Sequence, residues 1–325
     1  MIRNHRVLLT RPNFYVLPEN LIEGGRKVKV HLECVPCFLR QALEATKMST
    51  DDEMVCEKAL RGVMAYLLNE QWTKIIPELG TNVHRIVKRF TGNMDPYKHL
   101  KEKYNQIALE LYPKLKLIVD NSKDPLLTAV KVAIAGNAID FGPRVDINLK
   151  REVQNALDNE LAINDIDQLK GSILKCKTVL YLADNAGEAF FDRILIEVFL
   201  KRSVKVTYVV KDAPILNDAT FRDAEIAGIS QMAKVMSIGT DCTGVLFKEC
   251  SNEFLSEFES SSLVISKGQG NYESLSDVKN KEIFFLLKIK CPIIADDTGA
   301  ETGSIVLKRT FNKNRNNFAS AKKPL

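Results

Sequence analysis

The amino-acid sequence predicts an α/β protein in which a helical subdomain precedes a domain built on a mostly parallel β-sheet. In the first 150 residues apolar side chains recur at helical spacing, and no strand signal of comparable strength appears. After residue 150, short apolar runs rich in β-formers alternate with helical stripes, which is typical of parallel strands covered on both faces. We therefore expect a basic extension over residues 1–27, a helical subdomain over 28–150 and a sheet domain over 151–325.

Length and composition exclude several classes of protein. A chain of 325 residues with 45% hydrophobic and 27% charged residues is typical of a soluble globular protein. No apolar run approaches the roughly 18 residues of a membrane span, so no membrane partner is expected. The net charge of +5 suits an anionic substrate, but the basic residues are scattered among 41 acidic ones and do not indicate nucleic-acid binding. Seven cysteines without regular spacing favour a reducing cytoplasm.

The first half of the chain contains one loosely patterned arm and several helical stripes. Residues 1–27 are basic and show no sustained periodicity, so a loosely ordered arm is expected. From residue 33 to about 116 the pattern is helical, and a further helix should end near residue 136. The clearest stripes lie at 38–46, 55–67, 104–115 and 126–134.

The second half alternates between predicted strands and predicted helices. Helical stripes are expected at 190–199, around Phe254 and Phe258, and around Ile283 and Leu287. The predicted strands are 178–183, 204–210, 234–238, 263–266 and 292–295, with 305–307 at the edge of the sheet.

The turn that follows the strand at 178–183 is the main candidate site. Asp184 and Asn185 end this strand, Glu188 lies in the turn, and a helical stripe begins at Phe190. Open α/β sheets bind ligands at the carboxyl ends of strands, and two adjacent oxygen donors suit a hard divalent cation. The alternative for an isolated turn of this kind is that Asp184 only caps the following helix.

The loops that follow the predicted strands 204–210 and 263–266 should meet this turn. Right-handed crossovers bring the loops at the carboxyl ends of parallel strands to one edge of the sheet. Asp184, Asn185 and Asp218 could then share one metal ion, although Asp212 is an equal candidate by position alone. Lys267 lies in a glycine-flanked turn, where it could meet an anion together with backbone N–H groups.

Six segments, taken in order, resemble the damage-control phosphatases, a metal-dependent family once catalogued as domain of unknown function 89. The resemblance covers about residues 29–308, and the paired cysteines of the first segment resemble a branch found mainly in archaea and bacteria. The segments are C-V-P-C-F-L-R-Q, T-G-N-M-D-P-Y, A-G-N-A-I-D-F-G, A-D-N-A-G-E, N-D-A-T and S-K-G-Q-G-N-Y-E.

This resemblance implies a helical subdomain joined to a three-layer α/β/α domain that hydrolyses small phosphomonoesters such as sugar phosphates or damaged phosphometabolites. It implies a divalent metal ion (Mn²⁺, Ni²⁺, Co²⁺ or Mg²⁺) held by Asp184, Asn185 and Asp218. Asp184, Asp218 and Lys267 would carry catalysis. The expected substrate-binding residues are Glu188, Asn137, Asp140, Gly268, Gly270 and Asn271. Asn137 and Asp140 have a second interpretation, since such residues often only satisfy backbone groups at a helix end.

The sequence departs from the family pattern in two places. Thr243 stands before Gly244 where family members often have a proline. Asp296 and Asp297 form an acidic pair where a more variable or basic segment is expected. Both departures bear on the identity of the substrate more than on the class of reaction.

Cys34 and Cys37 form a C-x-x-C pair with three interpretations. A thioredoxin-like motif should follow a strand, whereas the flanking pattern here is helical. A structural zinc site needs four ligands, and the sequence has no second C-x-x-C and no H-x₃-H pair. Thiols that pack beside the site, or that form a labile disulfide, remain the favoured interpretation.

Two other functions compete with phosphomonoester hydrolysis. One is an S-adenosylmethionine-dependent carboxyl methyltransferase, which would need a glycine-rich cofactor turn where 184–187 has a single glycine. The other is a non-catalytic metal-binding module. The sequence leaves open whether water or an aspartate attacks the phosphorus, which metal is used, and the oligomeric state.

Overall fold

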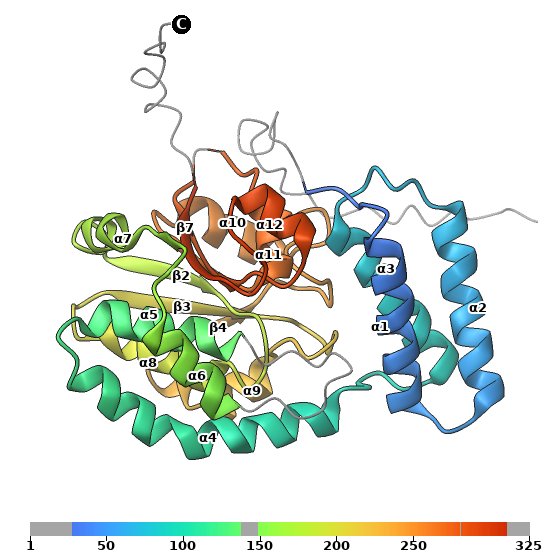
Figure 1. Cartoon of the computed structure of the whole chain (residues 1–325), viewed down its shortest axis with the longest axis horizontal. Coiled ribbons are helices and arrows are strands. Elements are labelled where there is room, and N and C mark those ends of the chain that lie inside the picture. The colour runs from blue at the N-terminus through green and yellow to red at the C-terminus, as the bar shows by residue number, and fades with distance from the viewer. Residues whose placement is uncertain (1–27, 138–148, 280, 311–325) are drawn as a thin grey trace, which may run out of the picture.

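The computed structural model describes residues 28–137, 149–279 and 281–310, and it combines α-helices with a seven-stranded sheet (Figure 1). The predicted mixed α/β fold class is therefore confirmed. The predicted arm at 1–27 and the candidate Asp140 lie outside the described residues.

The sheet has the order β1-β7-β6-β5-β2-β3-β4, with β2 inside it. Neighbouring strands run parallel except for β6 and β7, which are antiparallel. The strands are β1 Ile163–Asn164, β2 Thr178–Leu182, β3 Lys205–Val210, β4 Lys234–Ser237, β5 Val264–Lys267, β6 Ile283–Lys288 and β7 Ile305–Arg309. Since β3 and β5 lie on opposite sides of β2, the strand order reverses there, which is where open sheets place ligands.

The helices form two layers on the sheet and a group at one end of it (Figure 1). The described helices are α1 Cys34–Ser49, α2 Glu53–Asn69, α3 Ile76–Thr91, α4 Lys98–Asp120, α5 Pro125–Gly136, α6 Leu149–Asp158, α7 Ile166–Ile173, α8 Ala189–Leu200, α9 Phe221–Ile226, α10 Asn252–Ser260, α11 Gln269–Leu275 and α12 Pro292–Thr298. Among the described helices, none has the length and apolar character required to cross a membrane.

Strand β2 shows why both faces of the sheet are covered. Its side chains alternate between the faces, so Val179 and Tyr181 join one apolar cluster while Leu180 and Leu182 join the other. The first cluster contains residues of α4, α5 and α8, and the second contains residues of α10, α11 and α12. A strand buried in this way lacks a polar face, which explains the uninterrupted apolar run in its sequence.

The helices of the first half lie in two places. Helices α1, α2 and α3 pack on one another beside the sheet, whereas α4 and α5 pack against α8 and cover the sheet itself (Figure 1). Contacts thus cross residue 150 extensively, and the predicted domain division there stays a prediction.

Three predicted elements need correction. The run at 292–295 is the start of α12, because Pro292 occupies the first helical turn, where it is well tolerated. Ile283 and Leu287 belong to strand β6, whose residues are apolar on both faces and so imitate a helical stripe. Strand β7 is not at the edge, because β1 pairs with its outer side. The strands predicted at 178–183, 204–210, 234–238 and 263–266 are confirmed to within one residue at each end.

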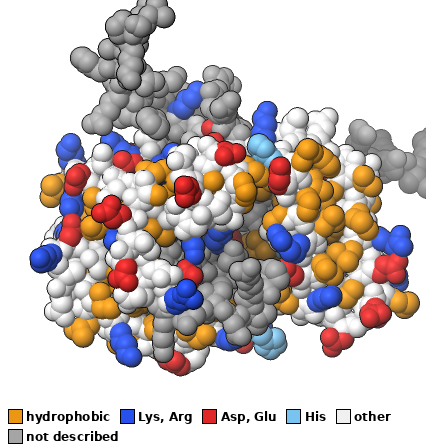
Figure 2. Space-filling view, in the orientation of Figure 1, with side chains coloured by type: hydrophobic (Ala, Val, Ile, Leu, Met, Phe, Trp, Pro, Cys, Tyr) orange, Lys and Arg blue, Asp and Glu red, His pale blue; other side chains and the backbone are white. Residues whose placement is uncertain are grey.

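Exposed apolar side chains gather on the helices beside the sheet, on the side where Figure 2 shows an orange surface. They include Leu43 on α1, Met54 and Leu68 on α2, and Phe90 on α3.

Candidate functional site

The turn after β2 lies in close contact with two other segments, the residues that follow β5 and helix α4. Gly268 has φ +78°, and a Cβ atom on it would lie 1.9 Å from Oδ2 of Asp184, so only glycine allows this approach. On the other side, a Cβ atom on Gly187 would lie 3.1 Å from main-chain atoms of Tyr104 on α4. The turn that carries Asp184 therefore contacts both the β5 loop and a helix of the first half.

Asn185 and Asp218 are adjacent, as the sequence predicted for two strand-end loops. Their backbones form an antiparallel bridge, and Asn217 Nδ2 donates to Asn185 Oδ1 at 2.6 Å. Asp212 lies elsewhere: it is exposed and accepts a hydrogen bond of 2.8 Å from Ser237 Oγ at the end of β4. The geometry therefore brings Asp218, and not Asp212, beside Asn185.

Glu188 is the centre of a hydrogen-bonded group beneath the turn. It is 0% exposed, and its Oε2 accepts from Asn185 Nδ2 at 3.0 Å and from Asn137 Nδ2 at 3.3 Å. Asn137 Nδ2 also donates to Asp184 Oδ2 at 2.6 Å. Asn137, at the end of α5, is thus part of the candidate site, although these amides hold Glu188 inside the protein instead of leaving it facing an open cleft.

Lys267 is not in the turn where the sequence analysis put it. It is the last residue of β5, is 0% exposed, and donates to Glu188 Oε1, to Asp192 Oδ1 at 2.7 Å and to Ala133 O at 3.0 Å. Burial lowers the pKa of Lys267, but the charges of Asp192 and Glu188 outweigh it, and the net direction is upward. The position of Lys267 in a turn is therefore corrected, while its predicted contact with an anion stays a prediction.

Asp192 was missed by sequence reasoning. It is 0% exposed on α8, one turn after Glu188, and accepts from Tyr181 at 2.7 Å and Tyr208 at 2.8 Å. The available signal was an acidic residue inside an otherwise apolar helical stripe. Since buried charges need partners, that signal could have pointed to Lys267.

The remaining loop residues stabilise the rim. Asn271 Nδ2 donates to Ala183 O at 3.0 Å and to Lys267 O at 2.8 Å, so it links the ends of β2 and β5. A Cβ atom on Gly244 would lie 2.4 Å from Gly270 O, which explains the glycine of the loop after β4. Asn271 is buried, and Gly270 and Gly268 bring backbone close to neighbouring loops.

The two aspartates have perturbed pKa values. Burial, followed by the charges of Glu188 and Asp218, raises the pKa of Asp184 to about 8. Burial raises the pKa of Asp218 to about 6, against the opposing charges of Lys211 and Lys101. These buried acids repel one another when they are ionised. A bound cation would reduce that repulsion and favour their ionised forms.

The donor set suits a hard divalent cation: two carboxylates and the carboxamide of Asn185 offer oxygen ligands from adjacent loops. Within the described residues, no three His, Cys, Asp or Glu side chains gather in a metal-binding arrangement. Asn185 would therefore have to complete the set with Asp184 and Asp218.

Cys34 and Cys37 begin α1 and are free thiols. Burial raises the pKa of Cys34 to about 11, so its thiol is protonated at neutral pH. A reactive thiolate, as in a redox motif, would need the opposite shift.

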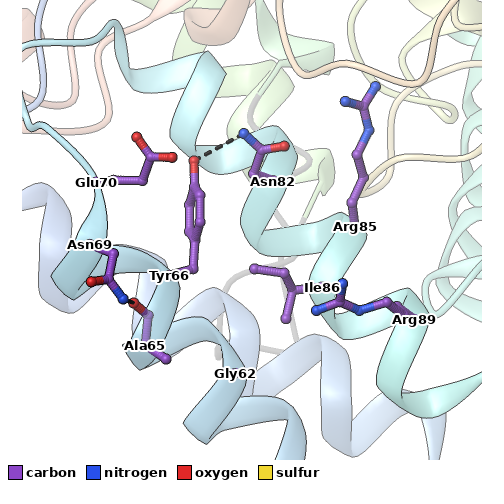
Figure 3. Close-up of a pocket in the computed structure, with 9 residues that line it drawn as sticks. All are labelled: Gly62, Ala65, Tyr66, Asn69, Glu70, Asn82, Arg85, Ile86 and Arg89. Atoms are coloured by element: carbon purple, nitrogen blue, oxygen red, sulfur yellow. Dashed lines mark hydrogen bonds between the residues drawn. The ribbon is translucent and has the colours of Figure 1, made fainter.

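A separate hollow of about 660 Å³ lies between α2 and α3 (Figure 3). It is lined partly by Tyr66, Asn82 and Arg89, and Asn82 Nδ2 donates to the Tyr66 hydroxyl at 2.9 Å. None of the strand-end site residues lines it.

Comparisons with known proteins agree with the predicted family and with the fold. The family described as the damage-control phosphatase ARMT1-like domain matches residues 30–306. An uncharacterized protein of Methanocaldococcus jannaschii is 41% identical over 295 residues, which cover 88% of this chain and 97% of the relative. A damage-control phosphatase of Pyrococcus horikoshii is 36% identical over 87% of this chain and 98% of its own length.

Two further relatives extend this match. A damage-control phosphatase of Archaeoglobus fulgidus is 35% identical, with 86% of this chain and 99% of the relative covered. A crystal structure of a protein of the domain of unknown function 89 family from Pyrococcus horikoshii superposes with a TM-score of 0.80 at 34% identity, covering 87% of this chain and 99% of that one. The chain therefore belongs to the damage-control phosphatase family with the ARMT1-like domain, as its six ordered segments predicted.

Proposed function

We propose that this protein is a metal-dependent phosphatase that hydrolyses small phosphomonoesters, such as sugar phosphates or damaged phosphometabolites. The observation that carries the proposal is the bridge between Asn185 and Asp218, which brings two acidic strand-end loops together beside Glu188. Two relatives that match nearly their whole length are named damage-control phosphatases, which supports the same reaction class.

Asp184, Asn185 and Asp218 would hold a divalent metal ion, with Mn²⁺, Ni²⁺, Co²⁺ and Mg²⁺ as candidates. A metal bound there would neutralise charge on the phosphoryl oxygens and lower the pKa of a bound water. The protein would keep these ligands in place through Asn137 and Glu188, whose hydrogen bonds fix the side chains of Asp184 and Asn185. The second layer of contacts matters because it determines which way each ligand atom faces.

The test is metal-resolved turnover of p-nitrophenyl phosphate, followed by a panel of small phosphomonoesters. Asp184→Ala and Asp218→Ala should lose bound metal and activity together, because each removes an anionic ligand. Asp212→Ala is the matched control, since its exposed carboxylate bonds Ser237 instead, and it should keep both. Loss of metal in Asp212→Ala with retention in Asp218→Ala would contradict the ligand assignment.

The same assay separates hydrolysis from the competing functions. A carboxyl methyltransferase would transfer a methyl group from S-adenosylmethionine and leave p-nitrophenyl phosphate intact. A non-catalytic module would bind metal without turnover of either compound. Release of phosphate that depends on added metal therefore supports the proposed function alone.

A further inference from the structure

The loop that carries Asp218 contains a strained residue. It runs from Lys211, directly after β3, to Thr220, directly before α9, and Leu216 in it has φ +47°. This left-handed conformation is uncommon for a leucine, because its Cβ atom crowds the backbone there. Strain of this kind persists only where the surrounding structure holds the backbone in place. The contacts on either side of Leu216 therefore show what keeps Asp218 in position.

The second half of this loop is bonded to the turn that follows β2. The carbonyl of Asn217 accepts from the backbone N–H of Ala186 at 2.9 Å. The backbone N–H of Ala219 donates to the carbonyl of Asp184 at 2.7 Å. These two bonds fix the residues on both sides of Asp218 against the backbone that carries the other two proposed metal ligands.

The first half of the loop is held by Lys88, which comes from α3. Lys88 Nζ donates to the carbonyl of Pro214, two residues before Leu216. It also donates to Asp241 Oδ2 at 2.9 Å, so the loop after β4 orients its ammonium group. Lys88 is only 5% exposed, and a buried ammonium group keeps such partners because leaving it without them costs free energy. Lys88 thus joins α3 to the strained part of the loop.

Arg85, three residues earlier on α3, has different partners. It donates to Asp241 Oδ1 at 2.6 Å and to Glu249 Oε2 at 2.6 Å, and both acids lie on the loop after β4. Among the residues that the structure describes, Lys88 and not Arg85 bonds to the loop that carries Asp218. The two cations therefore share one acid but differ in their contact with the candidate site.

We propose that Lys88 is a positioning residue that holds the strained loop in the form in which Asp218 lies beside Asn185, before a metal ion binds. This inference rests on the metal-dependent function proposed above. An ion that finds only a fraction of the molecules in the competent form binds with an affinity reduced by that fraction. Lys88 raises the fraction by keeping the carbonyl of Pro214 in place. The helices beside the sheet, which supply none of the proposed ligands, thereby set the metal affinity of the site.

Calorimetric titration of the metal-free protein with Mn²⁺ tests the proposal. Lys88→Met should weaken Mn²⁺ binding by about 10-fold, the effect of a competent fraction that falls to about one tenth. The Mn²⁺ concentration that gives half-maximal hydrolysis should rise by a similar factor. Arg85→Met is the matched control, because it removes a partner of Asp241 but not of Pro214, and its Mn²⁺ affinity should stay within about 2-fold of wild type. Equal Mn²⁺ affinity in Lys88→Met and the wild type would overturn the inference.

Amide hydrogen exchange in the metal-free protein gives a second measurement that does not depend on activity. The N–H group of Asp218 donates to the carbonyl of Ile215 at 3.0 Å, and that of Ala219 donates to the turn after β2 at 2.7 Å, so both report the shape of the loop. Lys88→Met should speed their exchange by about 10-fold, and Arg85→Met by no more than about 2-fold. Equal acceleration in the two variants would mean that Lys88 supports only the docking of α3, which contradicts a positioning role.

A second substitution tests the part that strain at Leu216 plays. Asparagine adopts left-handed backbone conformations much more readily than leucine does. If Lys88 works against this strain, Lys88→Met combined with Leu216→Asn should recover Mn²⁺ affinity to within about 3-fold of wild type. A double variant that binds Mn²⁺ no better than Lys88→Met would contradict the proposal that Lys88 holds a strained loop.

These measurements separate the inference from the proposed function. A wild-type protein that binds Mn²⁺ but hydrolyses no phosphomonoester contradicts only the phosphatase proposal, since metal affinity and amide exchange still test Lys88. A wild-type protein that hydrolyses phosphomonoesters with added metal, while Lys88→Met keeps wild-type Mn²⁺ affinity and loop exchange, contradicts only the inference. A wild-type protein that binds no divalent metal ion would overturn both.

Discussion

Two clusters of charged side chains connect parts of this molecule that are distant in the sequence. One cluster is fully buried and the other is partly exposed to solvent. The buried cluster consists of Glu188, Lys267 and Asp192, all with side chains 0% exposed. The interface cluster consists of Arg85 and Lys88 on α3 with Asp241 and Glu249 on the loop after β4, and its side chains are 6% to 35% exposed. One cluster lies under the strand-end site, and the other joins α3 to the sheet domain.

The difference in exposure determines what each cluster contributes. In the buried cluster the charges have given up their hydration, so each member depends on the others. In the interface cluster, water and salt screen the exposed pairs, and Asp241 has two cationic partners. We therefore expect the loss of one member to be costly in the buried cluster and to be better tolerated in the interface cluster.

The largest expected effect comes from removing the cation of the buried cluster. Lys267→Met should destabilise the protein by about 3–5 kcal/mol, because it leaves two acids without a counter-charge. Thermal melting should show a midpoint lower by about 4–7 °C. Lys88→Met is the comparison in the interface cluster. It should reduce stability by less than half as much, because Asp241 still forms an ion pair with Arg85. Equal losses in the two variants would remove the distinction between the clusters.

A second prediction concerns pH and the acids above the buried cluster. The pKa of Asp184 is raised from 3.8 to about 8 in the folded protein, so its contribution to stability is complete below pH 3.8 and is lost as pH rises through about 8. Metal-free protein should therefore lose on the order of 2–3 kcal/mol between pH 5 and pH 8. Melting curves across this range provide the measurement. Asp184→Asn should weaken the dependence of the free energy of unfolding on pH. An unchanged pH dependence in that variant would mean that other groups cause it.

A smaller effect is expected from the exposed part of the interface cluster. Arg85→Met should destabilise by about 1 kcal/mol or less, and the difference should shrink in 1 M salt, since its pairs are partly exposed. Arg61→Met provides a control, because the pair with Glu57 is 72% and 62% exposed and should contribute nothing measurable. A loss of stability in Arg85→Met that is the same at high salt would mean that packing, and not charge, stabilises this interface.

The smallest effect on turnover is expected from the thiols, which belong to neither cluster. The double substitution of Cys34 and Cys37 by serine should keep activity within about 2-fold under reducing conditions, because hydrolysis needs no thiol and the pKa of Cys34 is raised to about 11. Phosphate release by the metal-loaded double variant is the measurement. Complete loss of activity in a folded, metal-loaded variant would place these thiols in the mechanism.

The sequence by itself determined the fold class and the neighbourhood of the site. Local apolar patterns suffice for this, because a strand covered on both faces has to be apolar throughout, as 178–182 is. They fail where two structures share one pattern: the run 283–288 has both faces buried and imitates a helix, and 292–298 begins as a β-like run but forms α12.

Only the tertiary structure decided which polar residues face the rim and which lie beneath it. Lys267 and Lys290 both follow apolar strands in the sequence, yet one meets Glu188 and Asp192 in the interior and the other lies half-buried beside Gln269. The acidic partners of Lys267 lie at the start of α8 and on it, and the partner of Lys290 is the first residue of α11, so all are distant along the chain. The free energy of a charged side chain depends on the groups that surround it in space, and a single sequence does not contain that information in its local pattern.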